Sequence, residues 1–324
     1  MSASGESATR VLSLPPHYDF GRTVGGLPMS RHDPCVKIAD GAFWFATRTP
    51  DGPATLRLRR EGPALTATGY GPGAAWVVAQ ADGIAGLRDD LSGFEELAAQ
   101  HPVVADLARR HRGLRFAATG QVFPRLLRAI FEQKVTGQEA YRAYTATVRH
   151  FAGGQPAPGP LTTLRLPPDP AEVAATPYWV FHRFGVEQRR TDTLLRAAQV
   201  ADRLQACADV ETLTKRLTAI QGIGAWTAAE VTRVVFGDPD AVSVGDFHIP
   251  HMVAWGLAGE ARAGSRDAGP DARRGSLSPA DKRMLELLEP FRGHRGRVCV
   301  LLELGGHMAP KFGPRMPIRS FASF

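Results

Sequence analysis

The chain has 324 residues, of which 44% are hydrophobic and 22% are charged. This composition is close to the globular average and excludes collagen-like, coiled-coil and wholly disordered proteins, while the length favours two domains. Lys and Arg outnumber Asp and Glu by 39 to 32, a net charge of +7, so a polyanion is a suitable partner.

Cysteine usage and hydropathy exclude several further classes. Cys35, Cys207 and Cys299 lie far apart and form no C-x-x-C pair, so neither a zinc ribbon, an iron–sulfur cluster nor a disulfide framework is expected. No run of 18 apolar residues occurs, so the sequence predicts no membrane span. The start, MSASGESATR, lacks the apolar core of a signal peptide, which favours a cytoplasmic protein.

The N-terminal third has the texture of a β-sheet. Residues 1–13 are small and polar, and we expect them to be disordered. Residues 14–95 contain short β-prone runs separated by Asp51-Gly52-Pro53 and Glu61-Gly62-Pro63, which are turn signals. The pattern predicts antiparallel hairpins, and the strand-like texture continues through a second apolar run, AAWVVA.

Residues 96–305 have helical periodicity instead. The first amphipathic helix is expected to end near Lys134, because Thr136 and Glu139 have the spacing of a capping box that starts a new helix. Gln133 to Thr136 would then form an exposed corner between two helices. The apolar stripe of the first helix consists of Phe123, Leu126, Leu127, Ile130 and Phe131.

Further helices are expected over residues 186–207, 211–219, 225–236, 282–288 and 296–304, and another after Asp246. Residues 260–279 are poor in apolar side chains and are predicted to be a flexible insertion. Residues 306–324 are predicted to be a basic, extended tail. The expected fold class is α+β, an N-terminal antiparallel β-sheet domain followed by an all-α domain.

Gly222, Ile223 and Gly224 form a short hairpin between two of these helices. Two glycines allow positive φ and the close approach of another backbone. The next helix begins at once, so the amides from about Gly224 to Trp226 point outward from the positive end of a helix, where a phosphate binds. The alternative is an ordinary helical hairpin whose turn uses glycine.

Asp246 lies 22 residues after Gly224 and just before a helix with Pro250 in its first turn. An aspartate at this position is commonly a helix N-cap, and that structural role is the alternative to a catalytic one.

The hairpin, the sequence Gly-Ile-Gly-x-Trp-Thr-Ala and the following Asp246 together resemble the HhH-GPD superfamily of helix-hairpin-helix DNA glycosylases. The nearest resemblance is to the AlkA-like branch, 3-methyladenine DNA glycosylase II. Three further segments occur in the order of that branch, so the likeness covers most of residues 14–305. They are Tyr18–Phe20, Ala129–Val135, and Pro290–Arg292 with Leu301-Leu302.

The resemblance implies a monofunctional DNA glycosylase of base excision repair with an all-α helix-hairpin-helix domain. Such an enzyme flips an alkylated purine of the 3-methyladenine type out of double-stranded DNA and releases it by hydrolysis. Asp246 would be the catalytic carboxylate, which stabilises an oxocarbenium-like sugar and orients or deprotonates the attacking water. No cofactor is required.

The resemblance also implies how DNA is held. The corner would enter the minor groove as a wedge, although the wedge position is often apolar in the family and is Lys134 here. The hairpin would grip the phosphate backbone. The implied DNA-binding residues are Gln133, Lys134 and Thr136 at the corner, and Gly222, Ile223, Gly224, Ala225 and Thr227 at the hairpin. A solvated helix end is the alternative for Gln133 and Lys134.

Trp226 occupies the position where bifunctional relatives carry the lysine that forms a Schiff base, so only hydrolysis is implied. Its indole is a candidate wall of the base pocket, or a core residue, and Tyr141 and Trp179 are further candidates. The aromatics that the AlkA-like pattern places near Gly26 and Gly305 are absent.

The family can hold a sodium or potassium ion on hairpin carbonyls, which here would be those of Thr218, Ile220 and Ile223. The implied partner is double-stranded DNA, bound by a monomer without membrane contact, in a cytoplasmic and nucleoid-associated location. Two rivals stay open: a non-catalytic DNA-damage binder with the same fold, and a bifunctional oxidised-base glycosylase with lyase activity.

Overall fold

The computed structural model describes residues 7–264 and 277–310. Five strands form one antiparallel sheet in the order β1-β5-β4-β3-β2. The strands are β1 (Ser7–Ser13), β2 (Val36–Ala39), β3 (Ala42–Thr49), β4 (Gly52–Glu61) and β5 (Ala64–Tyr70). The hairpins expected at Asp51–Pro53 and Glu61–Pro63 are confirmed as the connections between β3 and β4 and between β4 and β5.

Two expectations for the N-terminal part are wrong. Residues 7–13 are an ordered edge strand that pairs with β5 over its whole length. The run AAWVVA is helix α2 (Ala74–Ala79), which packs on β5 and β1. A Cβ at Gly69 of β5 would lie 2.5 Å from the carbonyl oxygen of Ala74, so glycine is what lets this helix approach the sheet.

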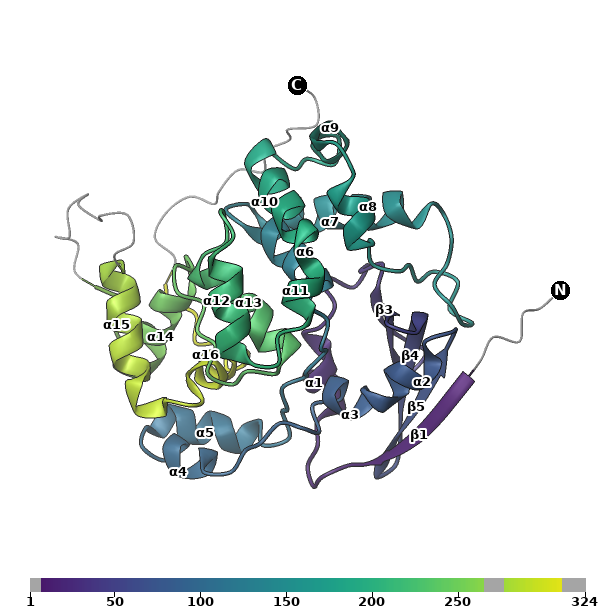
Figure 1. Ribbon diagram of the computed structural model, residues 1–324. Helices are drawn as coiled ribbons and strands as arrows, with labels where there is room; N and C mark the ends of the chain where they lie inside the picture. The colour runs from purple at the N-terminus through teal and green to yellow at the C-terminus, as the bar shows by residue number, and fades with distance from the viewer. Residues whose placement is uncertain (1–6, 265–276, 311–324) are drawn as a thin grey trace.

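The other helices build the rest of the molecule, most of them to the left of the sheet or above it in Figure 1. Before residue 121 they are α1 (Phe20–Gly25), α3 (Ala81–Ile84), α4 (Phe94–Ala98) and α5 (Pro102–Arg110). The central group comprises α6 (Val122–Glu132), α7 (Gly137–Ala152), α8 (Pro170–Ala174), α9 (Tyr178–His182), α10 (Gln188–Gln199) and α11 (Ala201–Gln205). The last group comprises α12 (Val210–Thr218), α13 (Ala225–Val235), α14 (Ile249–Ala258), α15 (Pro279–Leu288), a 3₁₀ turn (Glu289–Phe291) and α16 (Arg295–Leu304). The expected α+β fold class is confirmed.

The hydrophobic cores do not follow the expected boundary near residue 95. One continuous cluster joins the sheet to α6, α7, α10, α12 and α13. A second joins α4 and α5 to α14, α15 and α16. The sheet and the central helices therefore pack against each other, and α12 and α13 belong to the same hydrophobic core.

Parts of three predicted segments lie outside the described residues. These are residues 1–6 of the N-terminal stretch expected to be disordered, residues 265–276 of the insertion expected over 260–279, and residues 311–324 of the expected basic tail. No helix in the described part of the chain is long and apolar enough to cross a bilayer.

Candidate active site

The predicted hairpin joins α12 to α13, and its two glycines have different roles. Gly222 has φ +98°, and a Cβ there would lie 2.1 Å from Oγ1 of Thr193 on α10. Gly224 has φ −113° and open space where a Cβ would be. Only Gly222 therefore uses the positive φ that glycine allows, whereas Gly224 leaves exposed backbone at the start of α13.

This difference predicts opposite outcomes for two alanine substitutions. Gly222→Ala is expected to lower the free energy of unfolding by about 1–3 kcal/mol, since it combines backbone strain with the clash against Thr193. Gly224→Ala is expected to change it by less than about 0.5 kcal/mol. Urea denaturation of both variants measures this, and equal losses would contradict the different roles given to the two positions.

The corner between α6 and α7 is confirmed with its capping box. The amide of Thr136 donates to Oε2 of Glu139 at 2.8 Å, and the amide of Glu139 donates to Oγ1 of Thr136 at 3.3 Å. Lys134 has φ +53° and is exposed. The corner therefore presents the ammonium side chain of Lys134 to solvent.

Gln133 ties this corner to the hairpin. Its side-chain Nε2 donates to the carbonyl oxygen of Gly222 at 3.1 Å and to Oγ1 of Thr227 at 2.8 Å. The corner and the hairpin are thus neighbours in space, although they lie about 90 residues apart in sequence. The amide of Gln133 has protein partners, which leaves Lys134 as the projecting side chain of the corner.

Asp246 is half-buried between α13 and α14. Its Oδ1 accepts hydrogen bonds from the amides of His248 at 2.7 Å and Ile249 at 3.0 Å, at the start of α14. Its Oδ2 accepts the indole N–H of Trp226 at 3.0 Å. A carboxylate has about four acceptor positions, so three are filled by this protein and one, on Oδ2, is left for a ligand.

The loop that carries Asp246 is fixed from both sides. The amide of Asp246 donates to the carbonyl oxygen of Ser243 at 3.1 Å, and the hydroxyl of Ser243 donates to Oε1 of Glu230 on α13 at 2.6 Å. The amide of Gly245 donates to Oδ1 of the buried Asp281 at 2.8 Å. These contacts hold the catalytic candidate on α13 and α15 rather than on a free loop.

Glu230 is the charged anchor of this arrangement. Burial alone would raise the pKa of its carboxyl, but the guanidinium groups of Arg233 and Arg125 more than offset this and lower that pKa to about 2. The side chain of Arg233 donates to Oε2 of Glu230 at 2.7 Å, and Nε of Arg125 donates to its carbonyl oxygen at 2.8 Å. Glu230 is therefore ionised across the physiological range, and its carboxylate is a constant acceptor for the hydroxyl of Ser243.

The aromatic candidates are only partly brought together. Trp226 contacts Asp246 directly, and Tyr141 is half-buried on α7. Trp179 is 59% exposed, with the guanidinium of Arg183 5.2 Å from its ring centre, and Figure 1 shows α9 well apart from α13. One cavity between the sheet and α6 and another beside the end of α7 border neither Asp246 nor Trp226, so the base pocket stays a prediction.

Phe247 is the side chain at this site that the sequence analysis gave no role. It follows Asp246 directly and is 79% exposed, and its ring centre lies 5.0 Å from that of His248. An apolar ring that is exposed beside a carboxylate is available to a planar ligand. Its only sequence signal is its place next to Asp246.

The hairpin carbonyls give limited support to a bound cation. The carbonyl oxygen of Ile220 accepts the amide of Ile223 at 3.0 Å. The hydroxyl of Thr218 donates to the carbonyl oxygen of Thr214 at 2.9 Å. In the described part of the chain no group of three or more His, Cys, Asp or Glu side chains forms a metal site. A sodium or potassium ion on Thr218, Ile220 and Ile223 stays a prediction, and the chemistry below does not depend on it.

Comparison with solved structures identifies the fold of the chain. No protein-family model matches the chain, and no curated protein does. Among solved structures it is similar to 3-methyladenine DNA glycosylase from Archaeoglobus fulgidus, with a TM-score of 0.71 and 15% identity over 92% of this chain and 98% of that one. It is also similar to 8-oxoguanine glycosylase/lyase from Clostridium acetobutylicum, with a TM-score of 0.62 and 10% identity over 92% and 97%.

The second enzyme is also known with double-stranded DNA that carries cytosine opposite 8-oxoguanine, and that structure has a TM-score of 0.56 to this chain at 10% identity, over 84% and 98% of the two chains. These likenesses extend over both the sheet and the helices. The chain shares the fold of these DNA glycosylases, as the resemblance of its Gly222–Asp246 motif predicts.

Proposed function

We propose that this protein is a monofunctional DNA glycosylase that releases alkylated purines, of the 3-methyladenine type, from double-stranded DNA. The observation that carries the proposal is the carboxylate of Asp246, which two helix amides and the indole of Trp226 orient with one acceptor position left open. A carboxylate that served only as a helix cap would not need the hydrogen bond from Trp226.

The geometry supports hydrolysis by charge stabilisation. Breaking the bond between base and sugar builds positive charge on the sugar, and a fixed carboxylate in a partly desolvated site stabilises that charge without reorganising. The open position on Oδ2 of Asp246 can also accept a hydrogen bond from the attacking water. An alkylated purine already carries positive charge and leaves readily, so one carboxylate is sufficient.

DNA binding is supported by the end of α13. The exposed Gly224 and Ala225 lie at its positive end, where free amides donate hydrogen bonds to a phosphate. Lys134 projects from the neighbouring corner and has a stem long enough to fill space while its ammonium meets a phosphate. We propose that these two elements hold one strand across the minor groove, so that the flipped nucleotide faces Asp246.

Trp226 argues against lyase activity. At this position a bifunctional enzyme needs an amine, whereas the indole donates its N–H to Asp246. The chain therefore lacks, at this position, the nucleophile that a bifunctional oxidised-base glycosylase would need. If the protein were a non-catalytic damage binder, the orientation of the Asp246 carboxylate would have no purpose.

A base-release assay separates the three possibilities. Purified protein is incubated with methylated duplex DNA, with a duplex that carries 8-oxoguanine, and with undamaged DNA. We expect free 3-methyladenine, abasic sites and no strand cleavage before alkali treatment. No covalent complex should form with borohydride. A trapped complex would establish the bifunctional alternative, and tight binding without any released base would establish the damage binder.

A further inference from the structure

A concave region lies between the edge of the sheet and the end of α7. It has a volume of about 480 Å³, and its walls include Pro34, Lys37, Arg149, Thr162, Thr163 and Arg165. These residues come from the loop before β2, from β2, from the last turn of α7 and from the connection between α7 and α8. None of these segments contributes to the hairpin or to the loop that carries Asp246, so this cavity is separate from the proposed active site.

The charge of the cavity is one-sided. Lys37, Arg149 and Arg165 line it, and no Asp or Glu does. Within residues 7–264 and 277–310 none of these three cations forms a salt bridge. At Asp240, by contrast, the guanidinium of Arg295 is paired with a carboxylate. Three unit charges gathered in a hollow without a counter-ion make it a site of positive potential.

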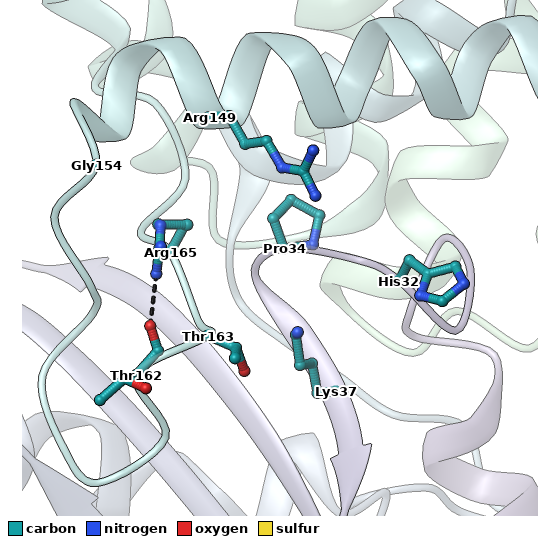
Figure 2. Close-up of a pocket in the computed structure, with 8 residues that line it drawn as sticks. All are labelled: His32, Pro34, Lys37, Arg149, Gly154, Thr162, Thr163 and Arg165. Atoms are coloured by element: carbon teal, nitrogen blue, oxygen red, sulfur yellow. Dashed lines mark hydrogen bonds between the residues drawn. The ribbon is translucent and has the colours of Figure 1, made fainter.

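The cationic groups point into the same space. Figure 2 shows Arg149 reaching down from α7 and Lys37 reaching up from β2, with Thr163 and Arg165 on the connecting segment. Arg165 donates to the carbonyl oxygens of Thr162 at 2.7 Å and Leu164 at 2.8 Å, which fixes that wall. The side chains of Lys37 and Arg149 have no hydrogen-bond partner among the described residues, so their donors are available.

We propose that this cavity binds a phosphate-bearing ligand. Three cationic side chains and the hydroxyls of Thr162 and Thr163 match a group with several acceptor oxygens and more than one negative charge. The C-terminal end of α7 contributes about half a negative charge, which three unit charges outweigh. The volume lies within the range of about 300–1,000 Å³ that is typical of small-ligand sites, so it exceeds the need of a single phosphate ion.

Such phosphates come either from a small phosphorylated molecule or from a DNA strand that extends past the corner. Arg149 lies 13 residues beyond Thr136 on the same helix, which is about 20 Å at 1.5 Å per residue. A strand that rises about 3.4 Å per nucleotide needs about six nucleotides to cover that distance. If the strand runs along α7 from the corner, a duplex with about five base pairs on each side of a lesion therefore ends short of the cavity.

The test uses the full chain with Lys37→Gln and Arg149→Gln combined, because neither side chain has a partner whose loss would unfold the protein. Calorimetric titration with pyrophosphate at low salt is expected to show binding to the unmodified protein. Because the double variant loses two donors of charge-assisted hydrogen bonds, it should bind pyrophosphate about 100-fold more weakly or worse. The control is Arg142→Gln, which removes one positive charge from an exposed position two turns before Arg149 on α7 and should bind pyrophosphate normally.

Duplex DNA of two lengths identifies the source of the phosphate. If the ligand is a small molecule, the double variant binds long and short duplexes as the unmodified protein does and loses only pyrophosphate. If the ligand is DNA, the double variant loses affinity for a duplex of about 30 base pairs and keeps its affinity for the short one. In both cases base release from the short duplex is unchanged. The proposal is overturned if pyrophosphate and the long duplex are both unaffected, or if Arg142→Gln has the same effect as the double substitution.

Discussion

Asp246→Asn is expected to reduce base release by at least about 10²–10³-fold, the loss typical of removing one preorganised electrostatic group from an active site. Asparagine has nearly the same shape, and its Oδ1 can still accept the amides of His248 and Ile249, so α14 keeps its cap. Its amide nitrogen, however, faces the indole N–H of Trp226 and carries no charge to stabilise the sugar. DNA affinity should persist, since the phosphate contacts proposed for α13 do not involve this side chain.

The matched control is Asp209→Asn. Asp209 caps α12 by accepting the amide of Thr212 at 2.7 Å, so the substitution repeats the chemical change at a capping aspartate outside the site. It should leave base release unaltered. Trp226→Phe keeps the carboxylate and an aromatic ring but removes the indole donor, and an intermediate loss is expected. Full activity of Asp246→Asn, measured as purine released per unit time, would refute the catalytic role of Asp246.

The parts of this site that the sequence predicts are those fixed by local chemistry. The capping box at Thr136 and Glu139 sets the corner, and Gly222, with its positive φ, sets the turn between α12 and α13. The start of α14 follows from Asp246 and Pro250. At the corner and at Asp246, residues within a few positions of one another satisfy the first amides of a helix, and at the hairpin one glycine conformation makes the turn, so periodicity and spacing are sufficient.

The contacts that join these elements are long-range and leave no local pattern. Gln133 reaches Gly222 and Thr227 across about 90 residues, and a glutamine at a helix end carries no signal of such a partner. Trp226 reaches Asp246 in the same way. The sequence therefore predicts which segments carry the site, whereas packing decides that Gln133 braces the hairpin and that Lys134 projects.

The N-terminal errors have a related cause. A short apolar run such as AAWVVA fits a buried strand or a helix equally well, and its close packing on the sheet as a helix depends on Gly69 in a neighbouring strand. Residues 7–13 are held by backbone pairing with β5, which small polar residues can make as well as apolar ones. Amino-acid composition indicates which side chains are buried, but it carries no information about backbone pairing at the edge of a sheet.

The largest single loss of stability is expected from removing one partner of the buried ion pair between Asp89 and Arg297. Both side chains are 2% exposed, and a guanidinium nitrogen of Arg297 on α16 lies 2.5 Å from Oδ1 of Asp89 in the segment between α3 and α4. Oδ2 of Asp89 accepts the amide of Phe116 at 2.8 Å. The guanidinium also lies 4.4 Å from the ring centre of Phe116. The pair therefore joins segments that are 208 residues apart.

Asp89→Asn is expected to lower the free energy of unfolding by about 3–5 kcal/mol, since it leaves a buried guanidinium without its counter-charge. Arg297→Met should cost a comparable amount by stranding the carboxylate. The double variant should recover much of the loss, because neither charge is then buried alone. Asp106→Asn is the control: its pairs with Arg109 and Arg110 are exposed, and such pairs contribute at most about 1 kcal/mol. Urea denaturation of the four variants tests this, and additive losses in the double variant would show that the two charges do not stabilise the fold as a pair.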